Sequence, residues 1–256
     1  MKSTTERREK IIGIAREKGS VRVDALARKY QVSTVTIRND LSFLEQQGLV
    51  MRSYGGAILR QSESKDVPFR KKNTLNHETK QKIGARAAAL IEPGDNIILD
   101  SGSTTHQIAC HMQDLSNVTV MTSALNIAGE LVKNPSVQVL MTGGILDTQS
   151  LSMSGIAAEQ TLGQFHFDKL FLAVDGFHLE NGITTWRESE ARLNKVMCDV
   201  ARDVIVVTDS SKFDKISLHR IIPTFRVDRL ITDSRIPDMY YEQLKASDID
   251  ITLVDA

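Results

Sequence analysis

Residues 32–48 read VSTVTIRNDLSFLEQQG, and this stretch decides the fold of the first part of the chain. Ser33 is a favoured N-cap, and Gly48 stands where a left-handed residue commonly ends a helix, so a helix is predicted over residues 34–47. Apolar side chains recur at the spacing of one buried helix face: Ile37, Leu41 and Leu44. The polar side chains of the first turns are left for the opposite, exposed face.

Two more helices are predicted ahead of this one. A helix over residues 5–18 carries its isoleucines largely on one face, and Gly19 supplies a stop at its end. Residues 20–23 alternate in polarity, which predicts a short strand. Asp24 then stands as the N-cap of a helix over residues 25–30.

A hairpin is predicted after the three helices. Two short strands over residues 49–54 and 57–59 flank Gly55-Gly56, which is a strong turn signal. Three helices followed by a hairpin indicate a winged helix-turn-helix domain over residues 1–59.

The formal net charge of zero hides a segregation of charge along the chain. Up to Lys72 there are 16 lysines and arginines against 8 aspartates and glutamates, a net charge of +8. The remaining residues hold 16 against 24, a net charge of −8. A basic first part favours a polyanionic partner, although chance segregation of solvated surface charge produces the same counts. Together with the helix-turn-helix, the charge indicates double-stranded DNA.

The side chains expected to meet DNA lie on the exposed face of the 34–47 helix and on the hairpin. Short hydroxyls, arginine and asparagine near a helix N-terminus contact phosphate oxygens and base edges. The candidates are Ser33, Thr34, Thr36, Arg38 and Asn39 on the helix, and Arg52 and Tyr54 on the hairpin. Arg38 has a second interpretation, which is a surface ion pair with Glu45 or Asp40.

The rest of the chain predicts an α/β domain over residues 76–256. Residues 60–75 are mostly polar, which is typical of a linker, and Asn76 is expected to cap a helix over residues 77–91. Strands that alternate with helices then indicate a mainly parallel sheet. The predicted strands cover residues 96–100, 118–121, 137–141, 169–174, 204–208, 229–232 and 249–254.

The first of these strands runs into a turn of small and hydroxyl-bearing residues at the start of a helix: Ser101, Gly102, Ser103, Thr104 and Thr105. Such a helix start presents several backbone N–H groups and the positive end of the helix dipole at one point. This arrangement suits a phosphate group, although an ordinary strand-to-helix turn has the same pattern. No Gly-Lys-Ser/Thr follows, so the turn is not a Walker motif.

Further polar residues follow other predicted strands, at positions where open α/β sheets bind ligands. They are Thr122, Gly143, Gly144, Asp175 and Lys212, and Glu188 opens a later helix. At such positions an aspartate recognises sugar hydroxyls and a lysine recognises phosphate. Each residue alone also fits a helix cap or a surface pair, but together they favour a polar pocket.

Four stretches of the first part form a specific combination: residues 6–12, 32–41, 44–48 and 54–57. In this combination the chain resembles the DeoR family of bacterial transcriptional regulators. The resemblance implies a repressor that binds operator DNA as a dimer or tetramer. Many members of the family carry a second arginine where this chain has Asn39. Because asparagine pairs with adenine, whereas arginine favours guanine or phosphate, we expect a divergent operator.

Segments of the second part resemble the sensor domain of the same family: residues 100–105, 143–144, 175–176, 182–185 and 209–213. That domain is related to ribose-5-phosphate isomerase. The resemblance implies a phosphorylated sugar as effector, with residues 101–105 on its phosphate and Asp175, Glu188 and Lys212 near the sugar.

Two further runs, residues 33–39 and 190–194, resemble family members that repress N-acetylgalactosamine and galactosamine use. An amino-sugar phosphate or a ketose phosphate is therefore the expected effector. A sugar-phosphate isomerase or deaminase with a DNA-binding module is the alternative. The isomerases carry another aspartate shortly after their Asp-Gly pair, where this chain has Phe177 and His178. Without that carboxylate, we predict a regulator with no cofactor and no enzymatic activity.

No apolar run approaches the roughly 18 residues that a membrane span needs, and no secretory signal is recognised, so a cytoplasmic protein without membrane contact is expected. The two cysteines, Cys110 and Cys198, do not have the spacing of a metal motif. His106, Cys110 and His111 lie within six residues, but no carboxylate accompanies them, and the set would need a ligand from elsewhere in the chain. We predict no metal site.

Overall fold

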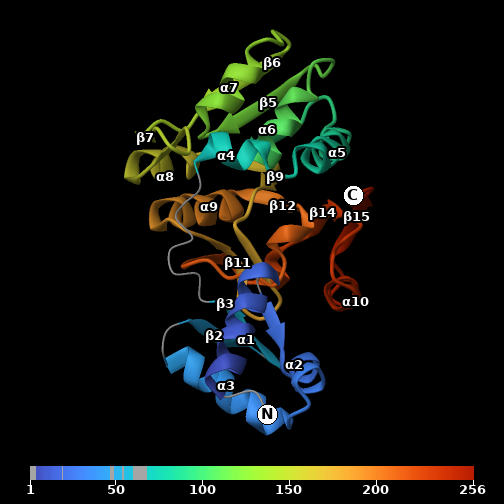
Figure 1. Cartoon of the computed structure of the whole chain (residues 1–256). Helices are drawn as coiled ribbons and strands as arrows, with labels where there is room; N and C mark the ends of the chain where they lie inside the picture. The colour runs from blue at the N-terminus through green and yellow to red at the C-terminus, as the bar shows by residue number, and fades with distance from the viewer. Residues whose placement is uncertain (1–3, 19, 47–48, 54, 60–67) are drawn as a thin grey trace. The chain divides into compact units, whose positions relative to one another are not determined.

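The computed structural model divides the chain into two units, Met1–Lys65 and Asp66–Ala256 (Figure 1). It describes residues 4–18, 20–46, 49–53, 55–59 and 68–256. Each unit has hydrophobic core clusters of its own. None of the helices among the described residues has the length and apolar character needed to cross a membrane.

The first unit is a winged helix-turn-helix, as the sequence predicts. Its elements are α1 (Thr4–Lys18), β1 (Ser20–Arg22), α2 (Val23–Tyr30), α3 (Thr34–Gln46), β2 (Val50–Ser53) and β3 (Gly56–Leu59). The strands form an antiparallel sheet in the order β1-β3-β2. A Cβ atom on Gly56 would lie 2.1 Å from the carbonyl oxygen of Val21, so the close approach of β1 and β3 requires a glycine here.

Helix α3 has the cap and the buried face that its sequence predicts. Ser33 Oγ accepts a hydrogen bond from the backbone N–H of Thr36 at 3.1 Å. Ile37 and Leu41 are fully buried, and Leu44 is 2% exposed. Burial of each of these side chains stabilises the unit by about 1.5–3 kcal/mol.

The prediction that Asp24 caps α2 is wrong. The helix begins earlier, at Val23, because β1 leads directly into it. The N–H of Val23 donates to the carbonyl oxygen of Gly55 at 2.8 Å, so the hairpin and not a side chain satisfies this first helical donor. Asp24 lies within the first turn, where its charge still complements the helix dipole.

The second unit contains a seven-stranded sheet in which every pairing is parallel. Its order is β15-β14-β12-β9-β4-β5-β6. The strands are β4 (Asn96–Leu99), β5 (Val118–Thr122), β6 (Val137–Met141), β9 (Phe167–Leu172), β12 (Ala201–Val207), β14 (Arg229–Asp233) and β15 (Asp250–Val254). All seven were predicted, and the α/β fold class is confirmed.

Helices cover both faces of this sheet. They are α4 (Phe69–Thr74), α5 (His77–Ala88), α6 (Ser103–Cys110), α7 (Leu125–Leu131), α8 (Ile156–Leu162), α9 (Glu188–Val200) and α10 (Asp238–Ala246), with short 3-10 turns η1 (Ser210–Lys212) and η2 (Thr224–Arg226). Strand β9 shows the layering: Phe171 packs into the core cluster with α5, α6 and α7, whereas Leu170 and Leu172 pack into the cluster with α8, α9 and α10. The alternation follows from the two-residue period of a strand.

Short antiparallel strands outside the main sheet were not predicted. They are β7 (Ile145–Asp147), β8 (Ser152–Ser154), β10 (Gly176–His178), β11 (Gly182–Thr185) and β13 (His219–Ile222). With three or four residues each, they are too short for a periodic pattern to stand out from a loop.

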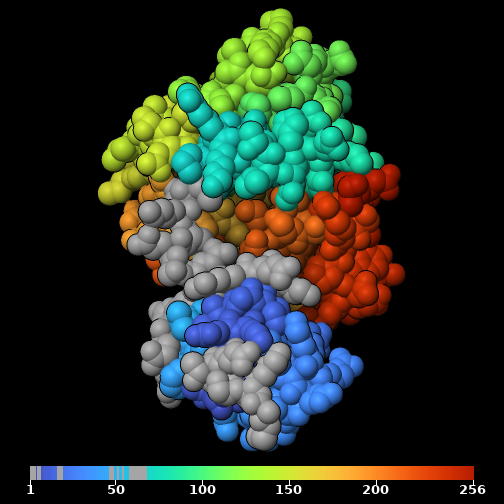
Figure 2. Space-filling view, in the orientation of Figure 1, coloured from blue at the N-terminus to red at the C-terminus, as the bar shows by residue number. Residues whose placement is uncertain are grey.

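The interpretation of residues 60–75 as a linker is wrong for residues 69–74, which form α4 within the second unit. The backbone N–H of Phe69 donates to the carbonyl oxygen of Gln149 at 2.9 Å, and its ring packs edge-on against His106 at 5.6 Å. In Figure 2 the cyan surface of α4 meets the yellow-green surface of the β7–β8 region. This helix could not be predicted from its polar sequence, because the residues that hold it in place, Gln149 and His106, lie far away in the chain.

Candidate nucleic-acid interface and anion site

The N-terminal half of α3 presents the residues that the sequence predicts for DNA. Ser33, Arg38 and Asn39 are exposed, and Thr34 and Thr36 are half-buried. The hydroxyls of Ser33 and Thr36 share a hydrogen bond of 2.9 Å, so both belong to the helix cap. This face therefore presents the Arg38 guanidinium and the Asn39 amide to a partner, together with hydroxyls that take part in the helix cap.

Neither carboxylate that was considered as an alternative partner of Arg38 pairs with it. Asp40 is 1% exposed and accepts hydrogen bonds from Arg7 Nε at 2.6 Å and Arg8 Nε at 2.8 Å. Glu45 Oε1 accepts a backbone N–H from the wing at 2.9 Å. Within the part of the chain that the structure describes, the Arg38 guanidinium forms no ion pair with a carboxylate.

Arg52 joins the wing to α3. Its Nη1 donates to Ser42 Oγ at 2.7 Å and to the carbonyl oxygen of Arg38 at 3.4 Å. Its guanidinium therefore lies beside the exposed face of the helix. The other candidate on the wing, Tyr54, lies outside the described residues.

Val35 is a candidate that the sequence reasoning missed. Its side chain is 59% exposed in the first turn of α3. An exposed apolar side chain among the residues predicted to contact DNA suits contact with the methyl group of thymine. The signal was present in the sequence, because a valine stands on the face opposite Ile37.

The predicted effector residues follow five neighbouring strands of the parallel sheet. In the order of the sheet, Lys212 follows β12, Asp175 follows β9, Ser101 follows β4, Thr122 ends β5, and Gly143 and Gly144 follow β6. Because parallel strands all end at the same edge, the topology brings these loops side by side.

Helix α6 begins at this edge without a side-chain cap. Its first-turn N–H groups have no partner within the helix. The side chains of Ser103, Thr104 and Thr105 are buried, and Thr105 Oγ1 donates to the carbonyl oxygen of Gly102 at 3.1 Å. An anion at this helix end would therefore be held by backbone N–H groups more than by the hydroxyls.

Gly102→Ala is expected to weaken phosphate binding at least about tenfold, a loss of about 1.4 kcal/mol. A Cβ atom here would lie 2.5 Å from the Cβ of Ala173 and 3.1 Å from Thr105 Oγ1, so the loop and its N–H groups must shift. Calorimetric titration with inorganic phosphate measures the change. Gly129→Ala is the matched control, since its Cβ would meet nothing within 4 Å. Equal phosphate affinity in Gly102→Ala and the wild type would locate the anion elsewhere.

Asp100 stands immediately before this loop and is 1% exposed. It accepts hydrogen bonds from the backbone N–H of Ala173 at 3.2 Å and from the amide of Asn194 at 3.4 Å. Burial raises the pKa of Asp100 well above its usual value; the Ser101 N–H offsets part of this, and repulsion from Glu190 adds to it. A carboxyl group that resists ionisation reduces the repulsion that an anion would meet here.

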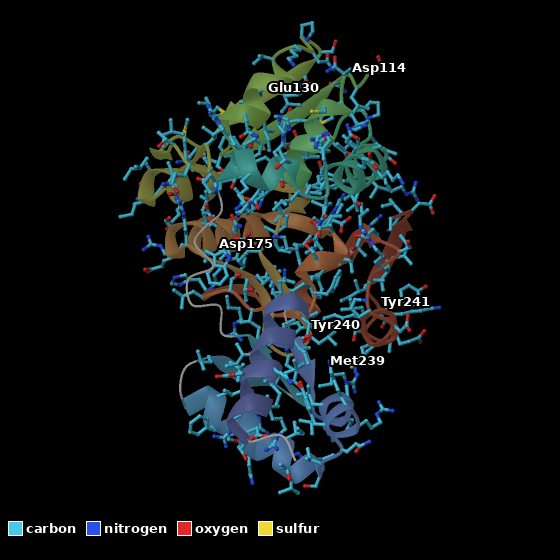
Figure 3. All side chains as sticks on the ribbon, viewed as in Figure 1. Asp114, Glu130, Asp175, Met239, Tyr240 and Tyr241 are labelled. Atoms are coloured by element: carbon cyan, nitrogen blue, oxygen red, sulfur yellow. The ribbon has the colours of Figure 1, made fainter. Side chains whose placement is uncertain are left out.

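Asp175, which is labelled in Figure 3, forms ion pairs with two lysines. Its side chain is 9% exposed, with Lys72 Nζ at 2.8 Å and Lys212 Nζ at 4.0 Å, and it accepts a hydrogen bond from Thr185 Oγ1 at 3.1 Å. Burial raises the pKa of Asp175, but the two ammonium groups and the Thr185 hydroxyl outweigh it, so the net pKa is below the usual value. Lys72, which belongs to α4, was missed because it fell within the predicted linker.

Two further contacts tie α4 and α5 to this edge. Lys80 is 4% exposed, and its Nζ donates to the carbonyl oxygens of Lys72 and Leu75, both at 2.6 Å. Burial lowers the pKa of Lys80 to about 8, although Asp209 acts in the opposite direction. Asn76 precedes α5 but does not cap it, because its amide donates to Asp209 Oδ1 at 3.0 Å.

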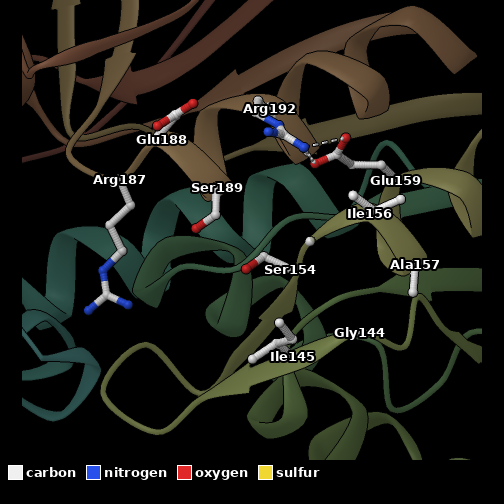
Figure 4. A pocket seen from close by; sticks show the side chains of 11 residues that line it. Gly144, Ile145, Ser154, Ile156, Ala157, Glu159, Arg187, Glu188, Ser189 and Arg192 are labelled. Atoms are coloured by element: carbon white, nitrogen blue, oxygen red, sulfur yellow. Dashed lines mark hydrogen bonds and ion pairs between the residues drawn. The ribbon is translucent and has the colours of Figure 1, made fainter.

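Gly144 and Glu188 line an open groove of about 790 Å³ (Figure 4). Glu188 is exposed at the start of α9, next to Arg187, which is hydrogen-bonded to Asp147. An ion pair of 3.0 Å between Arg192 and Glu159 forms another part of the wall. The groove thus combines two arginines and two glutamates with apolar side chains contributed by Ile145, Ile156 and Ala157.

The remaining candidates serve the backbone. Thr122 is fully buried, and its Oγ1 accepts the N–H of Ala124 at 3.1 Å. Gly143 and Gly144 have φ angles of 68° and 104°, and a Cβ on Gly144 would lie 2.5 Å from the carbonyl oxygen of Ser154. Both glycines therefore allow the turn after β6 that borders the groove.

Phe177 and His178, which stand where the isomerases have a second aspartate, pack into the protein. Phe177 is fully buried, with its ring 5.0 Å from Phe213 and 6.4 Å from Tyr240. His178 is 8% exposed, and its Nδ1 accepts the backbone N–H of Glu180 at 3.2 Å. These contacts are typical of side chains packed in a protein core.

Two family models match the chain. The model described as "DeoR-like helix-turn-helix domain" matches residues 7–63, and the model described as "DeoR C terminal sensor domain" matches residues 75–234. Together they span both units.

Named relatives match over nearly the full length. One is a protein of Escherichia coli O157:H7 whose name describes it as a transcriptional repressor of the aga operon; it is 49% identical over 98% of this chain and 94% of its own. Another is the HTH-type transcriptional regulator GolR of Listeria innocua serovar 6a, 34% identical over 98% of each chain. Among solved structures, ribose-5-phosphate isomerase A of Methanocaldococcus jannaschii is similar at 16% identity, with a TM-score of 0.40 over 54% of this chain and 55% of that chain.

Proposed function

Because the chain belongs to the DeoR family of transcriptional regulators, we propose that it represses an operon for the use of a carbohydrate or amino sugar and that a phosphorylated sugar controls its binding to DNA. The first unit binds double-stranded operator DNA, and the second unit binds the effector. The relatives named above are transcriptional regulators, which supports a regulator over an enzyme.

In this proposal α3 enters the major groove. Arg38 and Asn39 contact base edges or phosphates, Val35 contacts a thymine methyl, and Arg52 contacts the backbone beside them. The exposure of these side chains and the engagement of Asp40 elsewhere support this assignment. A homo-oligomer, dimer or tetramer, would present two such helices to a symmetric operator.

The observation that carries the effector site is the pairing of Asp175 with Lys72 and Lys212 at the sheet edge where α6 begins. A sugar phosphate has an anionic group that binds lysines and backbone N–H groups, and hydroxyls that donate to a carboxylate. The cluster holds these complementary groups within one site. Without a bound anion, the Asp175 carboxylate forms ion pairs with both lysines.

Helix α4 supplies a route from this site to DNA binding. Lys72 belongs to α4, and α4 follows the segment that joins the two units in sequence. A phosphate that competes with Asp175 for Lys72 would change the contacts that hold α4. By linkage, an effector that favours one arrangement of α4 alters operator affinity only if the two arrangements bind DNA unequally.

A titration against the protein–DNA complex tests the proposal. The operator is first selected from random duplexes on the immobilised protein, and fluorescence anisotropy then follows its release or retention. We expect one of a panel of amino-sugar and ketose phosphates to change operator affinity by about 5–150-fold. The unphosphorylated sugars are the negative controls, and inorganic phosphate measures the part of the response that the phosphate group alone produces. No response to any sugar phosphate would contradict the effector class, and no salt-dependent DNA binding would contradict the regulator itself.

The same panel distinguishes a regulator from a sugar-phosphate isomerase or deaminase. The protein is incubated with each sugar phosphate, and the products are separated and quantified. We expect binding without turnover. Product formation at a rate proportional to protein concentration would overturn the regulatory assignment of the second unit.

Lys72→Ala is expected to leave operator binding in place and to reduce the effector's change in operator affinity about fivefold or more, which is a loss of coupling of about 1 kcal/mol. The reason is that the variant removes the ammonium group through which α4 contacts Asp175. Lys71→Ala, at the exposed neighbouring position, removes the same charge and should respond as the wild type does. An unchanged response in Lys72→Ala would exclude α4 as the route.

A further inference from the structure

Three metal-ligating side chains meet between α6 and α7. His106 and Cys110 lie one turn apart on α6. Glu130, which is labelled in Figure 3, lies on α7. His106 Nδ1 and Cys110 Sγ are 3.9 Å apart, and one ligand atom from each of the three residues lies within 4.8 Å of the others. The sequence grouped His111 with the first two and predicted no metal site, because nothing in it indicated that α7 brings a carboxylate to them.

We propose that His106, Cys110 and Glu130 bind a zinc ion. Zinc binds imidazole nitrogen, thiolate sulfur and carboxylate oxygen at about 2.0–2.3 Å in a tetrahedron, which places ligand atoms about 3.5 Å apart. The present spacing reaches this value with small side-chain adjustments. A thiolate and an imidazole in one site select zinc over magnesium or calcium. Three protein ligands leave the fourth position to water.

The surroundings of the three ligands permit an ion to enter. All three residues are half-buried, so the site is reached from solvent but shielded on one side. Lys133 Nζ donates to Glu130 Oε2 at 2.6 Å, and the Lys133 side chain is 58% exposed. Because an exposed ion pair of this kind is worth about 0–1 kcal/mol, Lys133 is easily displaced by a divalent cation.

Zinc binding displaces one proton from the protein. The thiolate of Cys110 is the metal ligand, so the zinc–sulfur bond forms as the thiol proton passes to solvent. His106 binds as the neutral imidazole, through one ring nitrogen.

A bound zinc ion would connect two parts of the second unit. The ring of His106 packs edge-on against Phe69 of α4 at 5.6 Å. Coordination holds the imidazole in one orientation, and it joins α6 to α7 through the metal. We therefore expect zinc to raise the melting temperature of the wild type, and the rise should grow with the logarithm of the free zinc concentration above Kd.

The test is a zinc titration of the tag-free full-length protein, in competition with a chromophoric chelator. We expect one zinc ion per chain in the wild type and at least about tenfold weaker binding in Cys110→Ser and Glu130→Gln. His111→Ala is the matched control. His111 is exposed, and its Nδ1 lies 2.7 Å from the carbonyl oxygen of Gln107, outside the cluster. No zinc binding by the wild type, or equal binding by Glu130→Gln, would overturn the proposal.

A second measurement on the wild type does not depend on whether a variant folds. Iodoacetamide alkylation of Cys110 is followed by peptide mass spectrometry with and without zinc. We expect zinc to slow alkylation of Cys110 severalfold, because the metal occupies the sulfur. Cys198 is the internal control, since it is 1% exposed and burial raises its pKa to about 12. An unchanged alkylation rate at Cys110 would exclude the site.

Discussion

Asp40→Ala is expected to destabilise the first unit by about 3 kcal/mol. The carboxylate of Asp40 is buried and joins Arg7 and Arg8, at 2.6 Å and 2.8 Å, to the face of α3. Removal of one partner from a buried ion pair costs about 3–5 kcal/mol, because the opposite charge loses its compensation. We expect the low end, since the Arg7 and Arg8 side chains retain 12% and 25% exposure and regain some solvation.

Hydrogen exchange on the full-length protein measures this effect unit by unit, which a global melting curve of a two-domain chain does not. The amides of α1 and α3 should exchange about a hundredfold faster in the variant, while those of the second unit keep their rates. Asp24→Ala removes the same charge from an exposed position in α2 and should cost less than about 1 kcal/mol. Equal protection of α1 and α3 in Asp40→Ala and the wild type would show that the ion pairs contribute no net stability.

Arg38→Ala is expected to weaken operator binding by about 1–3 kcal/mol, or about 5–150-fold. Arg38 is exposed in the first half of α3, and the described carboxylates near it are engaged elsewhere. Its guanidinium is therefore available for a bidentate contact with guanine or for a phosphate.

The pattern of the loss identifies the contact. If Arg38 reads a base, Arg38→Ala also relaxes sequence preference at one position, and Arg38→Lys fails to restore it. If Arg38 binds phosphate, affinity falls uniformly and the salt slope decreases by about one. Arg86→Ala on α5 removes an equal charge from the second unit and is the control for net charge. Operator affinity in Arg38→Ala equal to that in Arg86→Ala would remove Arg38 from the interface.

Local patterns were sufficient for most of the fold. The seven strands of the large sheet were visible as apolar runs. The central strands are apolar because both of their faces are buried, and the less buried edge strands β6 and β15 still carry apolar residues. Helix α3 was visible from Ser33 and the Ile37–Leu41–Leu44 spacing, since a cap and a buried stripe are properties of neighbouring residues. Helix α4 was not visible, because a short polar helix has neither signal.

Some residues of the candidate site could also be predicted from the sequence, and others could not. The positions of Asp175 and Lys212 after two strands could be predicted, because the direction of a parallel strand fixes which edge its loop occupies. The position of their partner Lys72 could not be predicted. Lys72 lies 103 residues from Asp175, on a helix and not after a strand, so no strand direction fixes the edge at which it lies. Asp40 was considered only with its neighbour Arg38, whereas its partners Arg7 and Arg8 lie more than thirty residues away on α1.

The amino-acid sequence by itself determined the two kinds of domain, the capped helix α3 with its exposed polar face, and the loops that line the sheet edge. Periodicity, caps and turn residues act over a few neighbouring positions, so they can be read along the chain. Only the tertiary structure decided which polar side chains meet: Arg7 and Arg8 with Asp40, Lys72 with Asp175, and His106 and Cys110 with Glu130. These encounters depend on how whole helices and strands pack against each other, and packing joins residues that no local pattern relates.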